Sequence, residues 1–447
     1  MLLNENFYKT RESICISHYP CLTHTVSPVD TEKLMDLNSK NFVNAVEGSV
    51  YIHIPFCEKI CKFCPFNKFI KEDNKVLKYL ECLHKEIDLY TSTKYVQDTQ
   101  FKCIAFGGGT PTCLSADQLG ELISYIRNKF KFDREPEISI EGTPESCDFN
   151  KLEQLAAYGV NRISFGIQTF NERLSNVLEL HHTIKQGIDA INNAHRVGIN
   201  NVGIDLMYNI PGQTKEEFIE DIEVAYKLGV EHITLFSMNI PPKTKIGKEI
   251  AEGKLPNIGT LSKEIELYSS AEYKLQSLGY IQYSVYDFAK ANKINLHAMN
   301  YFANQRNLIG IGAAAFGYIN DFMYINSGNL MEYEKMILDK KLPVLYGEKA
   351  TETDKKHGML VKGFRMLDIS KINYYTKFSS SVTEDFQEEI TELKRAGLLT
   401  ENEYTLSLTK KGRIYGNNIC QLFIQDKFKS NKIIRHMLTK GLKPEEF

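Results

Sequence analysis

Residues 50–64 read VYIHIPFCEKICKFC, an apolar run that leads directly into three cysteines, Cys57, Cys61 and Cys64. The apolar part is typical of a strand that is buried on both faces of a parallel sheet. Three thiolates in a C-x3-C-x2-C loop can hold three irons of a [4Fe-4S] cluster, whereas a structural cluster takes four cysteines. The stretch therefore predicts a buried strand that ends at a cluster with one iron open to a further ligand.

Short β-rich runs alternate with helical stretches from residue 50 to about residue 240. The expected strands are 50–54, 103–106, 138–140, 162–167, 202–207 and 232–236, and the expected connecting helices are 74–91, 116–130, 149–158, 184–197 and 215–228. Parallel neighbours need crossover connections of this kind, so the order predicts a parallel sheet. An open six-unit barrel and a doubly wound sheet both fit the pattern at this point.

The position of the unusual residues favours the barrel. At or near the C-terminal ends of the expected strands stand the cysteine loop, the glycine run 107–109, Glu141, Gln168, Asp205 and residues 237–239. A β/α barrel keeps its chemistry at this edge. We therefore predict an α/β fold built on a partial (β/α)6 TIM-like barrel.

Three parts are expected along the chain. They are an N-terminal extension or cap over residues 1–48, a core with a substrate-covering region over 49–345, and a small C-terminal helical or winged domain over 346–447. Beyond the barrel strands we expect strands at 281–288, 308–315 and 404–408, helices at 330–338 and 383–396, a turn at 397–399 and a closing helix after Gly412. The helix before that turn carries more acid than base, which favours a docking or lid role over DNA binding.

Composition narrows the class of protein. The 447 residues are 43% hydrophobic and 25% charged, with a formal net charge of -2, so no basic field indicates a nucleic-acid partner. No apolar run approaches the roughly 20 residues that cross a bilayer, and the N-terminus lacks a signal-peptide core. We expect a cytoplasmic protein without a transmembrane segment. The remaining cysteines are irregularly spaced, which predicts reduced core residues and not a disulfide framework.

Polar residues interrupt several of the apolar strands. The glycine run would let a polar ligand contact backbone groups, although a glycine turn after a strand is weak evidence when it is taken alone. Glu141, Arg162, Gln168 and Asp205 each need a partner, because a buried charge is costly unless it is paired. Glu141 suits an ammonium group or a ribose hydroxyl, and Asp205 suits a ribose diol. An internal ion pair between Arg162 and Glu141 is the alternative.

Other inorganic sites compete with the cluster. Zinc usually takes pairs of ligands from two loops, and no second cysteine or histidine pair follows Cys64. A redox pair formed by Cys61 and Cys64 would lack the usual helix start, because Pro65 follows. The pair His181-His182 favours a surface or capping role over metal binding, and His53 favours a structural hydrogen bond.

At the level of motifs the chain resembles the radical S-adenosylmethionine (SAM) superfamily, and within it the branch of oxygen-independent coproporphyrinogen III oxidase. The resemblance covers about residues 48–340 and rests on YIHIPFCEKICKFC at 51–64, FGGGTPT at 106–112, NRISFGIQTF at 161–170 and DLMYNIPGQT at 205–214. It implies a [4Fe-4S] cluster on Cys57, Cys61 and Cys64, whose open iron binds SAM and reduces it to methionine and a 5′-deoxyadenosyl radical. It also implies a second SAM molecule, anaerobic chemistry and an electron donor such as flavodoxin or ferredoxin.

The resemblance assigns roles to residues by motif position. Tyr51, Gly108 and Glu141 would contact the cluster-bound SAM. Contacts with the second SAM would come from Phe63, Gly109, Thr110, Gln168 and Asp205. Ile311 would also lie near the cofactor.

Three departures from the branch are informative. The oxidase carries a further cysteine where this chain has Phe66, and an arginine where it has Leu180. The related haem chaperone begins close to the cysteine loop and carries a His-Asn-x-x-Tyr-Trp motif, whereas here more than 50 residues precede the loop. The corresponding stretch, 297–302, reads HAMNYF, so only part of the chaperone motif is present.

These features lead to one leading hypothesis and two alternatives. The leading hypothesis is a two-SAM (class C) methyltransferase that acts on an sp2 carbon of a flat conjugated substrate. Haem or another porphyrin (including anaerobic ring opening), a quinone and a heteroaromatic ring are the candidate substrates. The alternatives are an oxidative decarboxylase of coproporphyrinogen III and a haem-binding chaperone with His297 as a ligand.

Overall fold

One large sheet organises the protein in the computed structural model, which describes residues 3, 5–12, 18–22, 24–38, 47–64, 67–238 and 244–429. The sheet has 13 strands in the order β1-β15-β14-β13-β12-β2-β5-β6-β7-β8-β9-β11-β10. Its centre is formed by β2 (Glu47–Ile54), β5 (Gln100–Gly108), β6 (Phe132–Gly142), β7 (Arg162–Gln168), β8 (Val202–Tyr208) and β9 (His232–Ser237). All six were predicted, and each pairs in parallel with the next.

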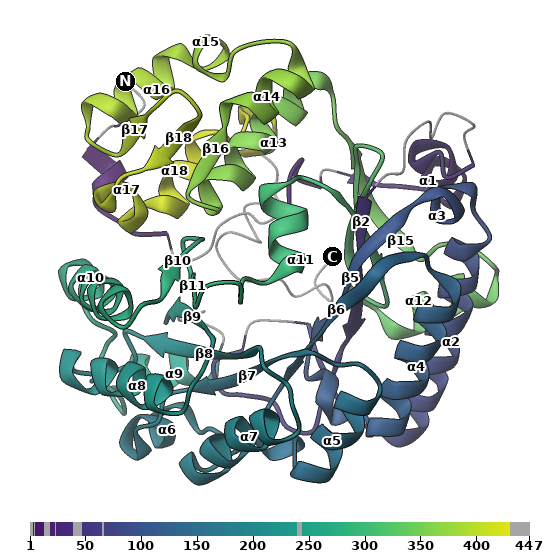
Figure 1. Ribbon diagram of the computed structural model, residues 1–447, viewed down its shortest axis with the longest axis horizontal. Coiled ribbons are helices and arrows are strands. Elements are labelled where there is room, and N and C mark those ends of the chain that lie inside the picture. Colours follow the sequence, from purple (N-terminus) through teal and green to yellow (C-terminus); the bar gives the residue numbers. More distant parts are fainter. Residues whose placement is uncertain are drawn as a thin grey trace.

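Helices cover the outer face of these strands, as Figure 1 shows. The crossover helices are α2 (Asp73–Thr91), α4 (Ala116–Lys129), α5 (Phe149–Ala157), α7 (Ile184–Arg196) and α8 (Lys215–Lys227). Capping boxes open three of them, at Ser115, Thr183 and Thr214, where the third residue into the helix returns a side chain to the cap. The arrangement confirms the predicted partial barrel.

Further helices and short strands complete the barrel region. They are α1 (Pro28–Met35), β3 (Phe56–Cys57), β4 (Phe69–Ile70), α3 (Lys94–Asp98), η2 (Pro111–Cys113), η3 (Pro144–Ser146), α6 (Glu172–Leu178), α9 (Lys245–Ala251), α10 (Leu261–Ser277), α11 (Leu296–Ala298), the π-helical turn η4 (Met299–Ala303) and α12 (Leu330–Leu338). The predicted helix at 330–338 is therefore confirmed at both ends.

Both edges of the sheet carry further strands. On one side β12 (Asn307–Ile311) runs parallel to β2 and is followed by antiparallel β13 (Phe316–Ile319), β14 (Phe322–Asn326), β15 (Val344–Lys349) and β1 (His24–Thr25). On the other side β11 (Asp287–Ala289) and β10 (Ile281–Gln282) form a hairpin. The strand predicted at 281–288 is therefore divided into two short strands, and the strand predicted at 308–315 ends earlier than expected.

The shortening has a local cause in each case. Residues 283–286 turn because the Ser284 hydroxyl accepts hydrogen bonds from the backbone N–H groups of Tyr286 and Asp287, both at 3.0 Å. The predicted strand at 308–315 ends at Ile311 because Gly312 and Ala314 adopt positive φ angles of 104° and 62°.

The C-terminal unit has its own three-stranded sheet, in the order β16-β18-β17. Its elements are α13 (Glu352–Arg365), β16 (Asp368–Ser370), α14 (Lys371–Phe378), α15 (Val382–Asp385), α16 (Gln387–Arg395), β17 (Leu399–Glu401), β18 (Thr405–Leu408), α17 (Lys410–Ile414), α18 (Gly416–Leu422) and α19 (Asp426–Lys429). The helix expected at 383–396 is broken at Phe386, whose ψ of 40° is not helical. Leu399 belongs to a strand and not to the expected turn.

The N-terminal segment contacts both the barrel and the C-terminal unit. Phe7, in the short helix η1 (Glu5–Tyr8), and Tyr19 share the hydrophobic core of the C-terminal unit. β1 extends the main sheet by pairing with β15. The boundary expected at 345/346 falls inside β15. No helix among the described residues combines the length and the hydropathy that a membrane span requires.

A buried carboxylate connects the first crossover helix to the neighbouring strands and helix beyond β2. Glu86 on α2 is fully buried and accepts hydrogen bonds from the Tyr333 hydroxyl (2.6 Å), the Gly312 N–H (2.8 Å) and the Asn326 amide (2.9 Å). Burial raises the pKa of Glu86 from 4.5 to about 7, although these donors act in the opposite direction. The group is therefore costly to ionise in the folded protein.

We predict that Glu86→Gln changes the pH dependence of stability. Between pH 4.5 and 7 the folded protein binds more protons at Glu86 than the unfolded chain does, so the free energy of unfolding falls as the pH rises. The wild-type free energy of unfolding, measured against that of Glu86→Gln by denaturant titration, should decline by up to about 3 kcal/mol across this interval. Parallel pH profiles for the two proteins would contradict the assignment.

Candidate active site

A cavity of about 720 Å³ opens at the C-terminal ends of the barrel strands. Ten of the residues predicted for the site line it: Cys57, Cys61, Phe63, Cys64, Gly108, Gly109, Thr110, Glu141, Gln168 and Asp205. Tyr51 and Ile311 do not line it. Ile311 is fully buried in the barrel core opposite Ile52, whereas Tyr51 lies just behind the cavity wall. The strand ends therefore bring most of the predicted residues together.

The cysteine loop is closed by a short parallel pairing. The backbone N–H of Phe69 donates to Pro55 (2.7 Å), and that of Lys71 donates to Cys57 (2.9 Å), so β3 and β4 hold the two ends of the loop together. Burial and the neighbouring thiols of Cys64 and Cys57 raise the pKa of Cys61 to about 12. All three cysteines line the same cavity.

A second set of contacts anchors the middle of the loop. The Lys62 side chain is 4% exposed, forms ion pairs with Glu249 and Glu179 (3.5 Å to the latter), and donates to the Val177 carbonyl at 3.2 Å. Lys62 was not among the predicted site residues, although a cation between Cys61 and Cys64 is a visible signal in the sequence. Lys62 fixes the loop against α6 and α9.

The glycine run lies against the cysteine loop with no room for side chains. A Cβ atom on Gly109 would lie 2.7 Å from the Phe56 carbonyl oxygen and 3.0 Å from the Cys57 sulfur. Gly108 has a φ of 115°, and a Cβ atom there would lie 2.7 Å from Nε2 of His53. Thr110 donates its hydroxyl to the Cys57 sulfur at 3.5 Å. The loop after β2 and the glycine run at the end of β5 therefore pack directly against each other.

Glu141 opens onto the cavity while lying deep in the barrel. Burial raises its pKa, and the Arg162 guanidinium and the Gly108 N–H partly offset that effect. The alternative of an internal ion pair is not realised: among the described residues Arg162 makes no ion pair, and its Nε has no hydrogen-bond partner. The Glu141 carboxylate is thus available to a ligand in the cavity.

Asp205 is the second carboxyl group in the cavity wall. Burial raises its pKa to about 7, and the nearby carboxylates of Glu141 and Asp287 add to the shift. A carboxyl group with this pKa is partly protonated near neutral pH, so it can donate as well as accept a hydrogen bond. Both capacities suit the ribose diol that was expected as its partner.

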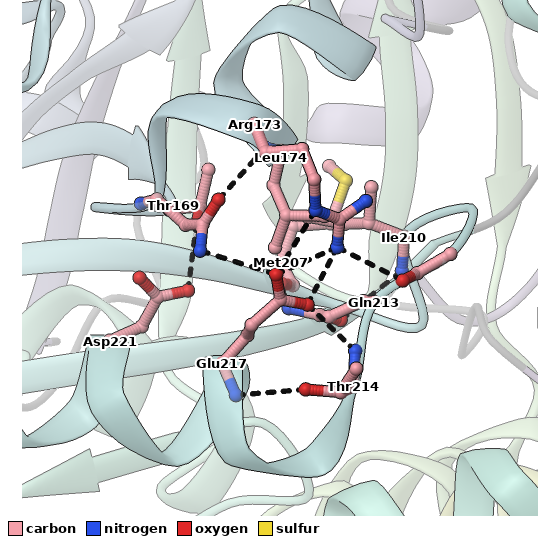
Figure 2. Close-up of polar contacts among 11 residues, drawn as sticks. Thr169, Arg173, Leu174, Met207, Ile210, Gln213, Thr214, Glu217 and Asp221 are labelled. Carbon is pink, nitrogen blue, oxygen red and sulfur yellow. Dashed lines mark hydrogen bonds and ion pairs between the residues drawn. The ribbon is translucent and has the colours of Figure 1, made fainter.

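A polar network behind the cavity fixes the loops that follow β7 and β8 (Figure 2). Asp221 on α8 accepts the Thr169 hydroxyl (2.8 Å) and the Phe170 N–H (2.6 Å), directly after Gln168. Arg173 pairs with Glu217 at 2.7 Å and donates to the Gly212 carbonyl at 3.0 Å, which joins the loop after β7 to the loop after β8. Gln168 itself has a φ of 66°. The network stabilises this backbone and so positions the Gln168 side chain.

The histidines differ from one another in role. The structural hydrogen bond predicted for His53 is confirmed, since its Nδ1 lies 3.1 Å from the Tyr51 hydroxyl. A surface or capping role was predicted for the His181-His182 pair, and a surface position is wrong for His182, which is 6% exposed and lies 3.6 Å from Glu145. His182 is the buried member because it packs beside η3. His181 lies at the cavity, with Nε2 3.4 Å from the Ile60 carbonyl.

The residues of the cavity fit the cofactors that the resemblance implies. Cys57, Cys61 and Cys64 are free thiols on one wall, and Glu141 and the glycine run face the space beside them. Among the described residues no three His, Cys, Asp or Glu side chains are grouped to hold a single metal ion. Thiolates carried on separate turns of a loop instead suit the separate irons of a cluster.

We predict that Lys62→Met weakens the cluster site. Removing the cation leaves Glu249 without its partner and should cost about 3 kcal/mol of stability. Iron and sulfide content after reconstitution should fall, as should the visible absorbance of the cluster. Lys75→Met is a matched control, because Lys75 forms an exposed pair with Glu72 at 2.7 Å. Full cluster content and unchanged unfolding in Lys62→Met would contradict the anchoring role.

Comparison with known protein families matches two parts of the chain. Residues 51–225 match the model of the radical SAM superfamily, and residues 350–415 match the HemN C-terminal domain. A solved structure of coproporphyrinogen III oxidase (HemN) from Escherichia coli, a radical SAM enzyme, superimposes with a TM-score of 0.79. The superposition covers 92% of this chain and 96% of that chain at 23% identity, which shows a shared fold.

Whole-length relatives agree with these matches. The heme chaperone HemW of Bacillus subtilis is 32% identical over 378 residues, which are 84% of this chain and 99% of the relative. The oxygen-independent coproporphyrinogen III oxidase of Helicobacter pylori is 30% identical over 408 residues, which are 86% of this chain and 88% of the relative. The chain therefore belongs to the radical SAM superfamily, in the branch that contains HemW and HemN.

Proposed function

We propose that this protein uses a [4Fe-4S] cluster and SAM to modify a flat tetrapyrrole inside its barrel. The observation that carries the proposal is the single cavity in which three free thiols, the glycine run and the carboxyl groups of Glu141 and Asp205 converge. The names of the relatives, a heme chaperone and a coproporphyrinogen oxidase, support a haem-related substrate.

The chain contributes binding and orientation to this chemistry. When bound, the cluster supplies the electron that cleaves SAM reductively. Cys57, Cys61 and Cys64 would hold the cluster, and Glu141 would accept a hydrogen bond from the ammonium group or a ribose hydroxyl of SAM. Gly108 and Gly109 would offer backbone groups to the amino-acid part of SAM. Only glycine permits this backbone, because a Cβ atom at either position would collide with His53 or the Phe56 carbonyl.

We further propose that the modification is methyl transfer from a second SAM. Phe63, Thr110, Gln168 and Asp205 line the same cavity and would contact that molecule. The relatives named above are a chaperone and oxidases, so methyl transfer rests on the residues of this chain. Leu180, which replaces the arginine of the oxidase, packs against the apolar cluster that contains Leu174 and Met207, as does Phe63. Phe66, the other departure, lies outside the described residues.

A chaperone function is the second candidate, and His297 favours it. The ring of His297 stacks at 5.8 Å on Tyr51, and its Nδ1 is buried without a hydrogen-bond partner. Burial and Arg162 lower its pKa to about 4, so the imidazole is neutral at pH 7, as an iron ligand must be. The 32% identity to HemW is consistent with this role.

The test of the enzymatic proposal is anaerobic turnover. Reconstituted protein is incubated with SAM, a reductant and haem or a porphyrin, and both nucleoside products are quantified. We expect S-adenosylhomocysteine together with 5′-deoxyadenosine and a methylated tetrapyrrole. Deoxyadenosine with vinyl products and no methylated ones would support the decarboxylase instead and would overturn methyl transfer.

Cys61→Ala provides the control for the radical chemistry. Loss of one thiolate should abolish the [4Fe-4S] spectrum and SAM cleavage together. A Cys61→Ala protein that kept its cluster and its full rate of SAM cleavage would overturn the radical proposal as a whole.

For the chaperone candidate we predict that His297→Ala weakens haem binding by about tenfold. The reason is the loss of the one neutral imidazole nitrogen that the structure leaves buried and unpaired on this segment. Haem is titrated and the Soret band is followed. His84→Ala is the control, because His84 lies on the outer helix α2 and bonds the Leu80 carbonyl at 2.8 Å. Equal affinities for all three proteins would exclude His297 as a ligand.

A further inference from the structure

Helix α13 directs two cations toward the barrel. Lys362 and Arg365 are three residues apart and so lie on one face of the helix. The Lys362 ammonium lies 4.8 Å from the ring centre of Tyr301 and 4.6 Å from that of Tyr318. The Arg365 guanidinium lies 4.5 Å from the ring of Phe302 and 4.9 Å from that of Tyr286. Four aromatic rings therefore surround the two cations.

Lys362 lacks a counter-ion in this position. It is 2% exposed, and among the described residues it makes neither a hydrogen bond nor an ion pair. The nearby carboxylate of Asp321 is engaged elsewhere, because it accepts the Tyr318 hydroxyl at 3.0 Å and pairs with Lys355 at 3.2 Å. Contacts with aromatic faces only partly replace the water that a buried ammonium loses. Burial lowers the pKa of Lys362 to about 7, and Lys377 adds to the shift.

An aromatic wall connects these cations with the catalytic end of the barrel. Tyr301 and Phe302 belong to η4, which directly follows His297, and His297 stacks on Tyr51 beside the cavity. His18 extends the wall, because it stacks on Phe316 with 4.0 Å between the ring centres and an angle of 7°. Its Nδ1 lies 3.1 Å from the Tyr301 hydroxyl. The segment from His297 to Phe302 thus contacts Tyr51 at one end and the two cations of α13 at the other.

We propose that Lys362 and Arg365 bind carboxylate groups of a flat conjugated ligand that lies along this aromatic wall. This inference rests on the proposed function and specifies the substrate further, as an anionic ring system whose acidic arms point to α13. A carboxylate would give Lys362 the counter-ion that it lacks, and the planar fork of Arg365 matches carboxylate geometry. The aromatic rings near the two cations suit contact with the conjugated ring that carries the carboxylates.

The experiment compares a dicarboxylic porphyrin with its dimethyl ester. Deuteroporphyrin IX and deuteroporphyrin IX dimethyl ester are titrated into the reconstituted full-length protein, and porphyrin fluorescence is followed. We expect the wild type to bind the free acid at least about tenfold more tightly than the ester. Lys362→Met and Arg365→Met should each weaken binding of the acid by about tenfold and leave the ester unchanged.

Lys356→Met is the matched control. Lys356 lies on the same helix but pairs with Asp385 at 2.7 Å, so its variant should bind both ligands as the wild type does. Equal affinity of the wild type for acid and ester would overturn the inference even if both variants failed to fold. Unchanged binding of the acid by a folded Lys362→Met protein would overturn it as well. In either case the tetrapyrrole proposal stands, whereas failure of the wild type to bind either porphyrin would overturn both.

Discussion

The parallel pairing of β2 with β5 is the constraint on which the rest of the site depends. The pairing sets Ile54 opposite Gly108, so the cysteine loop and the glycine run leave their strands at the same level. The loops can then approach so closely that the Phe56 carbonyl accepts the Thr110 N–H at 2.8 Å. A slip of one residue in this register would turn each strand's inward residues to the opposite face. The positions of the three cysteines and of the glycine run therefore both depend on the pairing of β2 with β5.

The interior of the barrel retains polar groups that the fold itself does not satisfy. Among the described residues, four buried ring or guanidinium nitrogens there have no hydrogen-bond partner: His53 Nε2, Arg162 Nε, His232 Nδ1 and His297 Nδ1. Native interiors pair nearly all such groups, because each unpaired one is costly. Lys362, on the helix α13 beside the barrel, likewise lacks a partner for its charge among the described residues. Both observations support the proposal that a polar ligand binds in this part of the protein.

The sequence predicted the barrel and most of the site because both follow from local patterns. Six apolar runs and their polar C-terminal neighbours were sufficient to place Glu141, Gln168 and Asp205 at one edge. The errors in element boundaries have local causes, whereas the missed site residues depend on contacts with distant parts of the sequence. Ser284 turns a β-rich run by bonding nearby backbone groups, and the non-helical backbone at Phe386 divides a helix that composition alone made continuous. The partners of Lys62 and Lys362 were not predictable, because they come from segments more than 40 residues away, and only the position of Lys62 between Cys61 and Cys64 gave a signal.

The contacts of residues 11 and 12 affect how the molecule is assembled. Arg11 donates to the Ile414 carbonyl at 2.7 Å and pairs with Glu264 at 2.7 Å, and Asn418 accepts the backbone N–H of Glu12 at 2.9 Å. The contacts with Ile414 and Asn418 can form only after α17 and α18 have been translated, about 400 residues after Arg11 itself. Until then residues 11 and 12 lack their hydrogen bonds to the C-terminal unit. Docking of this segment between the barrel and the C-terminal unit is therefore a late step of folding.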